Sequence, residues 1–455
     1  MGPTVGLDNH VLFAAGGETA MHPAVIAALL VVAALTLVLP RKYAVCPLLL
    51  LSIPLPLGQL IMLGPLHFQA YRILLVFGWV RLLWQRYVDE GCSARIRMNK
   101  IDKAVILYTL SSVICYSLLW QASGAFKAQL GEAYNVLGVY FVFRFFVRDS
   151  KDAQRIVKTL VIIAVIVAAC MLNEQITGRN ALAVLGGVPE NTQMREGYLR
   201  SQGPFRVYLT AGAFGATLLP LFLTLWHRAG ARVMASFGVV AAITITFTSR
   251  TSTALSAVLA TLIGLAFWPV RDRMRVVRRG VVCVLVGLHL VMKAPVWALL
   301  ARVDIVGGST GWHRYKIVDN FVQHFWDWWL LGSKDYWTWE GGDDMWDLAN
   351  QYVAIGESTG LLALLCFLAA IVYCFKYLGL ARKAAGLDVQ RAWFLWLFGV
   401  ALFSNLVVFL GISYFDQTRI YWYVVLAMVV AVSREGNLTV WQSVPEVETS
   451  EVELV

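Results

Sequence analysis

The sequence predicts an all-α fold, a polytopic membrane helix bundle of about 12–13 transmembrane helices with one large helical extracytoplasmic loop. Composition is the first reason: 59% of the 455 residues are hydrophobic and only 15% are charged, whereas soluble domains are about half apolar and a quarter charged. The second is a series of about thirteen long apolar runs, since about 20 such residues cross the hydrocarbon of a bilayer. The third is that Lys and Arg gather in alternate connections between these runs.

The apolar runs set the expected domain organisation. A bundle of ten helices is expected in 1–294, an outer loop with an amphipathic helix in 295–348, further transmembrane helices in 349–433, and a cytoplasmic tail in 434–455. The predicted spans lie near 24–39, 44–64, 67–84, 104–120, 130–147, 157–175, 205–226, 232–248, 252–268, 280–294, 349–377, 392–411 and 418–433.

Charge gives the expected orientation. With the N-terminus outside, seven alternate connections hold 25 of the 38 Lys and Arg residues, so the positive-inside rule places these connections in the cytoplasm. Topology thereby accounts for the net charge of +10. Membrane lipids with anionic headgroups are the expected partners of the basic connections, and no nucleic acid is expected.

The long outer loop contains an amphipathic stretch over 312–330 with apolar residues at helical spacing. One interpretation is a plain interfacial anchor, to which its tryptophans are suited. The other is that its polar face covers an active site, where Trp312 and the later Trp346 stack on sugars. The aromatic residues do not decide between the two, because an aromatic belt needs them equally.

Four arginines are candidates for binding an anion on the outer face: Arg72, Arg200, Arg250 and Arg314. Arginine at membrane depth is costly and tends to face a cavity or an anion. Its guanidinium matches phosphate bidentately, so several converging arginines suit a diphosphate. Snorkelling, or pairing with outer carboxylates, is the simpler alternative for any one of them.

Three residues are candidates for the general base of a sugar transfer: His313, Asp347 and Glu357. Nearby acidic residues could bind a divalent cation, although their irregular spacing favours a solvated loop. That acidic set is Asp335, Glu340, Asp343, Asp344 and Asp347.

Three elements in this order resemble the O-antigen ligase/polymerase superfamily. The first is Arg200–Ser–Gln–Gly203–Pro–Phe leading into a helix, and the second is a Ser249–Arg250 turn between two helices. The third is a long outer loop before a helix with Asn350 and, after nine residues, Gly360. The resemblance covers roughly residues 100–430.

The resemblance implies a metal-independent membrane glycosyltransferase without cofactor, acting at the outer face of the bacterial inner membrane. Its partners would be an undecaprenyl-diphosphate-linked glycan and, as acceptor, a growing polysaccharide or lipid A-core. Arg200 and Arg250 match the family's diphosphate-binding arginines, and Asn350 is placed at the glycan. Ala349 stands where the ligases have a histidine, which favours an O-antigen or exopolysaccharide polymerase over a ligase. A transporter of lipid-linked glycans or anions is the rival class, although no internal repeat supports it.

Overall fold

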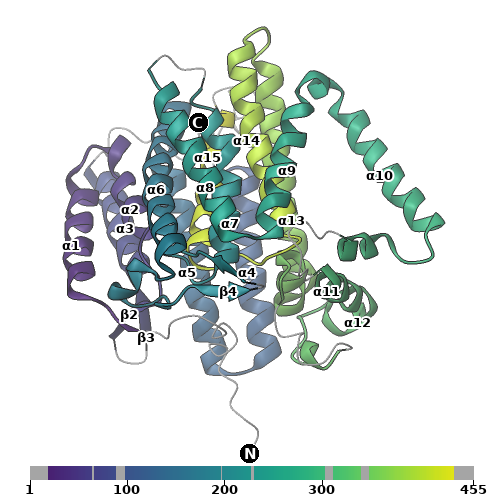
Figure 1. Cartoon of the computed structure of the whole chain (residues 1–455), viewed down its shortest axis with the longest axis horizontal. Helices are drawn as coiled ribbons and strands as arrows, with labels where there is room; N and C mark the ends of the chain where they lie inside the picture. Colours follow the sequence, from purple (N-terminus) through teal and green to yellow (C-terminus); the bar gives the residue numbers. More distant parts are fainter. Residues whose placement is uncertain are drawn as a thin grey trace, which may run out of the picture.

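The computed structural model describes residues 19–63, 66–88, 98–195, 197–226, 230–302, 311–339 and 348–434. It is mostly helical, as predicted (Figure 1). The α-helices are α1 (Pro23–Val38), α2 (Cys46–Ser52), α3 (Ala70–Val88), α4 (Lys100–Trp120), α5 (Ser123–Phe146), α6 (Ser150–Thr177), α7 (Tyr208–Leu223), α8 (Arg232–Ser249), α9 (Ser252–Ala266), α10 (Met274–Val291), α11 (Gly311–Gln323), α12 (Phe325–Trp328), α13 (Gln351–Ala384), α14 (Val389–Val408) and α15 (Asp416–Arg434). The strands are β1 (Thr19–Ala20), β2 (Gln59–Leu63), β3 (Leu66–Gln69), β4 (Gln193–Arg195) and β5 (Tyr198–Arg200).

Five helices within the described ranges are long and apolar enough to cross a membrane: α4, α6, α8, α13 and α14. The number is six if α9 and the helix after it form one bent span. These helices fit a multi-pass membrane protein. The number is smaller than the predicted 12–13, partly because α1 and α7 are apolar but have only 16 residues each.

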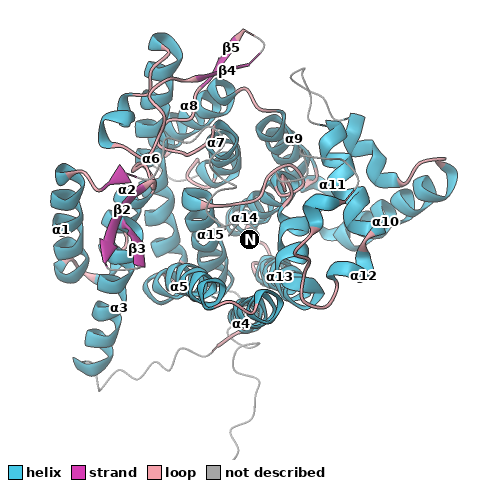
Figure 2. Ribbon diagram, turned by 90° about the horizontal axis from the view of Figure 1, so that it is seen from below, coloured by secondary structure: helices cyan, strands magenta, loops and turns pink. Residues whose placement is uncertain are grey.

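The centre of the bundle is α15, which the sequence predicts as a span over 418–433. It packs against α5, α6, α7, α13 and α14, and every residue from Ile420 to Ser433 is buried. Figure 2 shows it surrounded by other helices. A helix that is apolar all round is buried either in lipid or in protein, and here other helices of the chain cover it.

The predicted helix over 44–64 is wrong. The structure has α2, whose 7 residues extend only about 10 Å at 1.5 Å per residue, followed by β2. Strand β2 pairs antiparallel with β3, with Leu60 opposite Gln69, and parallel with β1. Pro54 and Pro56 explain the difference, because proline inside a helix removes a hydrogen bond and clashes with the preceding turn.

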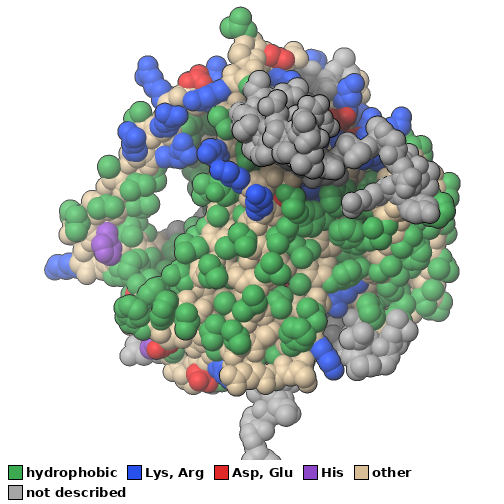
Figure 3. Space-filling model, turned by 180° about the vertical axis from the view of Figure 1, so that it is seen from behind, with side chains coloured by type: hydrophobic (Ala, Val, Ile, Leu, Met, Phe, Trp, Pro, Cys, Tyr) green, Lys and Arg blue, Asp and Glu red, His purple; other side chains and the backbone are tan. Residues whose placement is uncertain are grey.

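The predicted span at 280–294 corresponds to α10, which lies apart from the bundle. None of its residues is buried, and it is bent by 74° from α9. Figure 3 shows an opening between this helix and the rest of the molecule, and it shows Lys and Arg gathered above a band of hydrophobic side chains.

Helix α13 is broken at Gly360, whose φ of 77° and ψ of 177° are not helical. The segment that follows α12 runs along this break. Leu361 N donates to Trp329 O at 2.8 Å, and Ser333 N donates to Glu357 O at 2.7 Å. A β-carbon at position 360 would lie 2.5 Å from Leu330 O. Glycine is therefore required where the segment that follows α12 meets the helix.

The amphipathic stretch predicted over 312–330 is two helices, α11 and α12, separated at His324. Its buried face also differs from the predicted apolar one. Helix α11 buries Arg314, Ile317 and Asn320, whereas Val322 is 45% exposed. The buried residues of α11 are spaced three apart, and two of them are polar. A pattern of apolar residues alone does not reveal such a face.

Candidate functional site

Two of the predicted arginines lie close together where β5 meets the turn between α8 and α9. Ser201 N donates to Thr248 O at 3.1 Å, which joins the end of β5 to the end of α8. Arg250 forms the turn with a left-handed φ of 47°, and its Cζ lies 4.3 Å from the ring centroid of Tyr198. Since side chains alternate along a strand, Tyr198 and Arg200 share one face of β5.

Arg200 is held inside this site. Its Cζ lies 5.1 Å from the ring centroid of Tyr208, and its terminal nitrogen donates to the Tyr208 hydroxyl at 3.3 Å. The residue is only 8% exposed. Its Nε is buried and has no hydrogen-bond partner among the described residues. A buried guanidinium with an unused donor is suited to an anionic ligand.

The loop after Arg200 is fixed by Glu174, a residue of α6 that the sequence did not single out. Its carboxylate accepts from Gln202 N at 3.0 Å and from Gly203 N at 2.8 Å, and it accepts from the Thr192 hydroxyl at 3.1 Å. Glu174 is 0% exposed. It therefore holds the backbone that follows Arg200 through bonds to both amides.

The third predicted arginine approaches the same turn from α11. Arg314 is 9% exposed and donates to the Thr253 hydroxyl at 2.9 Å, three residues after Arg250. It also lies against Gly411, where a β-carbon would be 3.4 Å from its Cζ. Arg200, Arg250 and Arg314 thus belong to one end of the bundle, which we call the arginine site.

Asn350, predicted to bind glycan, is buried at the start of α13. Its Oδ1 accepts from Tyr352 N at 3.0 Å and Val353 N at 3.2 Å, so it is the N-cap of the helix. Its Nδ2 donates to Leu410 O at 3.5 Å, beside the glycine that contacts Arg314. Asn350 is only 2% exposed. Its role in the structure is to cap α13 and to bind the Leu410 carbonyl next to the arginine site.

The fourth predicted arginine, Arg72, is bonded to α5. Its Nε donates to Asn135 Oδ1 at 2.9 Å, and Asn135 donates to Glu132 at 3.3 Å. Glu132 forms an ion pair with Arg419. Arg72 is therefore connected through α5 to a different polar group.

Of the three predicted bases, His313 and Glu357 lie in the described ranges. His313 is half-buried on α11 next to Arg314, and Asp347 lies outside the described residues, as does Trp346. Glu357 is 0% exposed, and neither of its oxygens has a hydrogen-bond partner among the described residues. It lies near Tyr336, in the segment that follows α12: burial raises the pKa of Tyr336 to about 12, with the Glu357 charge as the second cause. Their catalytic roles stay predictions.

Trp312, predicted to bind glycan, is 62% exposed and packs on Tyr315 with ring centroids 5.1 Å apart. Of the acidic set that could bind a cation, only Asp335 lies in the described ranges. Within those ranges no cluster of three or more His, Cys, Asp or Glu residues could hold a metal ion.

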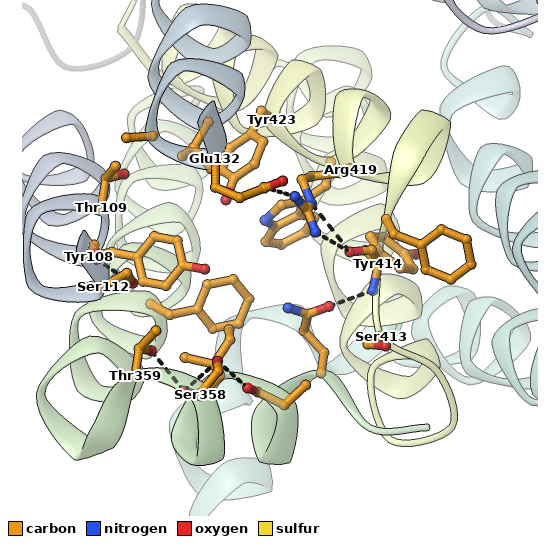
Figure 4. Close-up of a pocket in the computed structure, with 18 of the residues that line it drawn as sticks. Tyr108, Thr109, Ser112, Glu132, Ser358, Thr359, Ser413, Tyr414, Arg419 and Tyr423 are labelled. Atoms are coloured by element: carbon orange, nitrogen blue, oxygen red, sulfur yellow. Dashed lines mark hydrogen bonds and ion pairs between the residues drawn. The ribbon is translucent and has the colours of Figure 1, made fainter. Parts of the chain in front are cut away.

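A cavity of about 310 Å³ lies between α4, α5, α13 and α15 (Figure 4). It contains none of the residues predicted from the sequence. Glu132 and Arg419 point toward each other at this cavity, and Tyr108, Ser112 and Tyr423 surround it. We call it the central cavity.

The sequence did contain a signal for the central cavity. Glu132 and Arg419 each lie inside an apolar run predicted to span the membrane, over 130–147 and 418–433. An ionisable residue within a span is a candidate functional residue by itself. Their pairing, however, joins positions 287 residues apart and follows only from the packing of α5 against α15.

No protein-family profile and no curated protein sequence matches this chain.

Proposed function

We propose that the protein is a membrane glycosyltransferase that polymerises undecaprenyl-diphosphate-linked oligosaccharide units, of the O-antigen or exopolysaccharide type, at the outer face of the bacterial inner membrane. The observation that supports it best is that Arg200 and Arg250 lie at one strand–turn junction, the arginine site. Both guanidinium groups lie on tyrosine rings, and Arg200 keeps a buried donor without a partner among the described residues. Leaving such a donor unsatisfied costs about 1–3 kcal/mol, and a phosphate oxygen would satisfy it.

In the proposed reaction these arginines bind the leaving group, which is the diphosphate. A hydroxyl of the acceptor sugar attacks the anomeric carbon of the carrier-linked glycan. The new glycosidic bond forms as the bond between the anomeric carbon and the diphosphate oxygen breaks, and the diphosphate takes the electron pair. Arg200, Arg250 and Arg314 stabilise the negative charge that develops on it. The hydroxyl proton goes to a base, for which His313, Asp347 and Glu357 remain the candidates.

The position of Ala349 favours a polymerase over a ligase that transfers glycan to lipid A-core. In this chain Ala349 packs beside Leu348 against the buried pair Ile317 and Val353. An apolar contact thus occupies the place where the ligases of the resembled superfamily have a histidine. Transfer of glycan to lipid A-core by the purified protein would reverse this preference.

The test uses purified protein in lipid nanodiscs with a polyprenyl-diphosphate oligosaccharide from the cells that make the protein. We expect longer glycans on the carrier. Arg200→Ala and Arg250→Ala should lower the rate about 100- to 1,000-fold, the usual effect of removing one charge-stabilising donor. Arg179→Ala is the matched control, because Arg179 is 73% exposed and its contact with Glu190 is 3.7 Å long.

Two results would overturn the proposal. Undiminished elongation by both arginine variants would remove the diphosphate assignment. Movement of the intact lipid-linked glycan across a vesicle membrane, without any new glycosidic bond, would support the rival transporter.

A further inference from the structure

The central cavity opens at the end of the bundle where α13 and α15 begin. Glu132 and Arg419, which line it, are 40% and 32% exposed, so the cavity reaches solvent at this pair. An ion pair with this exposure stabilises a protein by about 0–1 kcal/mol. The contribution of this pair to holding α5 against α15 is therefore small, and the pair is available to contact a ligand in the cavity.

The charges of the cavity exclude one class of ligand and favour another. Among the described residues that line it, Glu132 and Arg419 are the two with a charge, and they are paired with each other. The net charge is zero. A diphosphate needs an excess of positive charge, so the anionic part of a lipid-linked glycan belongs at the arginine site and not here. An uncharged polar ligand suits the cavity.

The lining has the chemistry of a sugar site. Eight of its 21 residues carry a hydroxyl group. Five of these hydroxyls already donate within the protein, so toward a sugar they act as acceptors of its hydroxyl protons; they belong to Thr109, Ser112, Ser358, Thr359 and Tyr414. Aromatic side chains, including Phe409, Trp422 and Tyr423, supply apolar faces for the C–H surface of a sugar ring. The volume of about 310 Å³ is at the small end of ligand pockets, which suits about one or two sugar rings.

One donor in the lining is unused. Trp422 is only 2% exposed, and its indole Nε1 has no hydrogen-bond partner among the described residues. The indole N–H can only donate, and a buried donor without an acceptor is destabilising. A sugar oxygen in the cavity would be such an acceptor.

The central cavity is also tied to the arginine site. Helix α15, which supplies Arg419 and Trp422, begins beside the loop that follows Arg200. Gln417 Nε2 donates to Pro204 O at 2.9 Å, and Arg206 pairs with Asp416 at 3.0 Å. The loop after the diphosphate-binding residue is thus bonded to the helix that forms one wall of the cavity.

We infer that the central cavity is a subsite for an uncharged sugar unit of the glycan, with Trp422 Nε1 and the Glu132–Arg419 pair as its polar contacts. The inference rests on the proposed glycosyltransferase function and adds no bond-making step to it. It divides one ligand between two subsites, with the diphosphate at the arginine site and a neutral sugar in the cavity.

The test compares two probes, undecaprenyl diphosphate and the same lipid with a single neutral hexose. Wild-type protein in nanodiscs should bind the glycosylated lipid more tightly. Ser112→Phe, which fills the cavity, should abolish this preference and leave the affinity for bare undecaprenyl diphosphate unchanged. Leu110→Phe is the matched control on the same helix, since Leu110 is 49% exposed and does not line the cavity. Equal affinity of the wild-type protein for both probes would overturn the inference.

A second, smaller substitution tests the cavity in case the phenyl ring of Ser112→Phe impairs folding. Trp422→Phe keeps an aromatic ring and removes only the N–H donor. Loss of one hydrogen bond, worth about 0.5–1.5 kcal/mol, should weaken binding of the glycosylated lipid about two- to tenfold and spare the bare lipid. A full preference for the glycosylated lipid in both cavity variants would contradict the assignment.

Failure of the proposed function is recognisable separately. If bare undecaprenyl diphosphate does not bind the wild-type protein, the diphosphate site is wrong, and the cavity is then judged with a free methyl hexoside. Saturation-transfer NMR should show contact between this sugar and wild-type protein, and the contact should be lost in Ser112→Phe. Absence of transfer to the hexoside in the wild type would overturn the sugar subsite itself.

Discussion

Replacing Glu174 by alanine should loosen the loop that carries Arg200. The carboxylate accepts from Gln202 N and Gly203 N, at 3.0 and 2.8 Å, in a site where Glu174 is 0% exposed. Each buried amide left without an acceptor costs about 1–3 kcal/mol, so the free energy of unfolding should fall by about 2–6 kcal/mol. Water that refills the site would bring the loss toward the lower value. Unfolding in mixed detergent micelles measures it.

The same variant should weaken binding of undecaprenyl diphosphate by roughly tenfold, which corresponds to 1.4 kcal/mol of lost positioning of Arg200. Glu174→Gln should restore most of both quantities, because its amide oxygen can accept from the two backbone amides while its NH₂ group donates to the Thr192 hydroxyl. Glu190→Ala is the control, since Glu190 is 67% exposed. If Glu174→Ala matches Glu190→Ala in stability and in affinity, the loop does not depend on this carboxylate.

Three further substitutions, at Gly360, Asp102 and Tyr198, test the fold and the site, each with a matched control. Gly360→Ala should destabilise the protein by at least about 1–3 kcal/mol, because the backbone conformation there is essentially restricted to glycine. Gly379→Ala, in the same helix with open space around it, should be neutral or stabilising by up to about 1 kcal/mol. Asp102→Asn should cost about 3–5 kcal/mol, because Arg144, only 3% exposed, loses its partner at 3.2 Å. Tyr198→Ala should weaken binding of undecaprenyl diphosphate two- to fivefold, since an exposed cation–π contact is worth about 0.5–1 kcal/mol.

Unfolding in micelles measures the stability of the Gly360, Gly379 and Asp102 variants. Titration with undecaprenyl diphosphate measures the affinity of the Tyr198 variants. Asp272→Asn is the counterpart of Asp102→Asn: it also breaks an arginine pair, with Arg382 at 2.8 Å, but Asp272 is 73% exposed. It should cost less than about 1 kcal/mol. Equal losses from the two aspartates would mean that burial is not the cause. Tyr198→Phe should keep the affinity that Tyr198→Ala loses, and an equal loss would exclude the ring contact.

The sequence singles out the arginines of the arginine site but not the residues that hold them in place. Arg200 and Arg250 are predicted to bind one diphosphate because arginine at membrane depth tends to face a cavity or an anion. The two residues lie at one strand–turn junction, and their binding of a diphosphate stays a prediction. The sequence could not place Arg72, whose position follows from its bond to Asn135, a contact 63 residues away in the chain. Nor could it indicate Glu174, which resembles any polar residue near a helix end until the loop folds over it.

Hydropathy was a good guide to where helices lie and a poor guide to what covers them. The run over 418–433 and the run over 280–294 are similarly apolar, yet one is the buried centre of the bundle and the other has no buried residue. Apolar side chains avoid water equally well in lipid and in protein, so composition does not separate the two cases. In the stretch over 44–64, Pro54 and Pro56 outweigh the hydropathy and end the helix early.

The isolated position of α10 has a consequence for handling the protein. The described part of the chain buries none of its residues, so tertiary packing gives this helix little stability beyond local contacts such as that of His289 with Trp297. A solitary helix of 18 residues is marginal in water. In hydrocarbon it persists, because its backbone has no other hydrogen-bond partners. The lipid or detergent around α10 thus determines whether this helix stays folded. A change of detergent should alter the helicity of α10 before it disturbs the packed helices around α15.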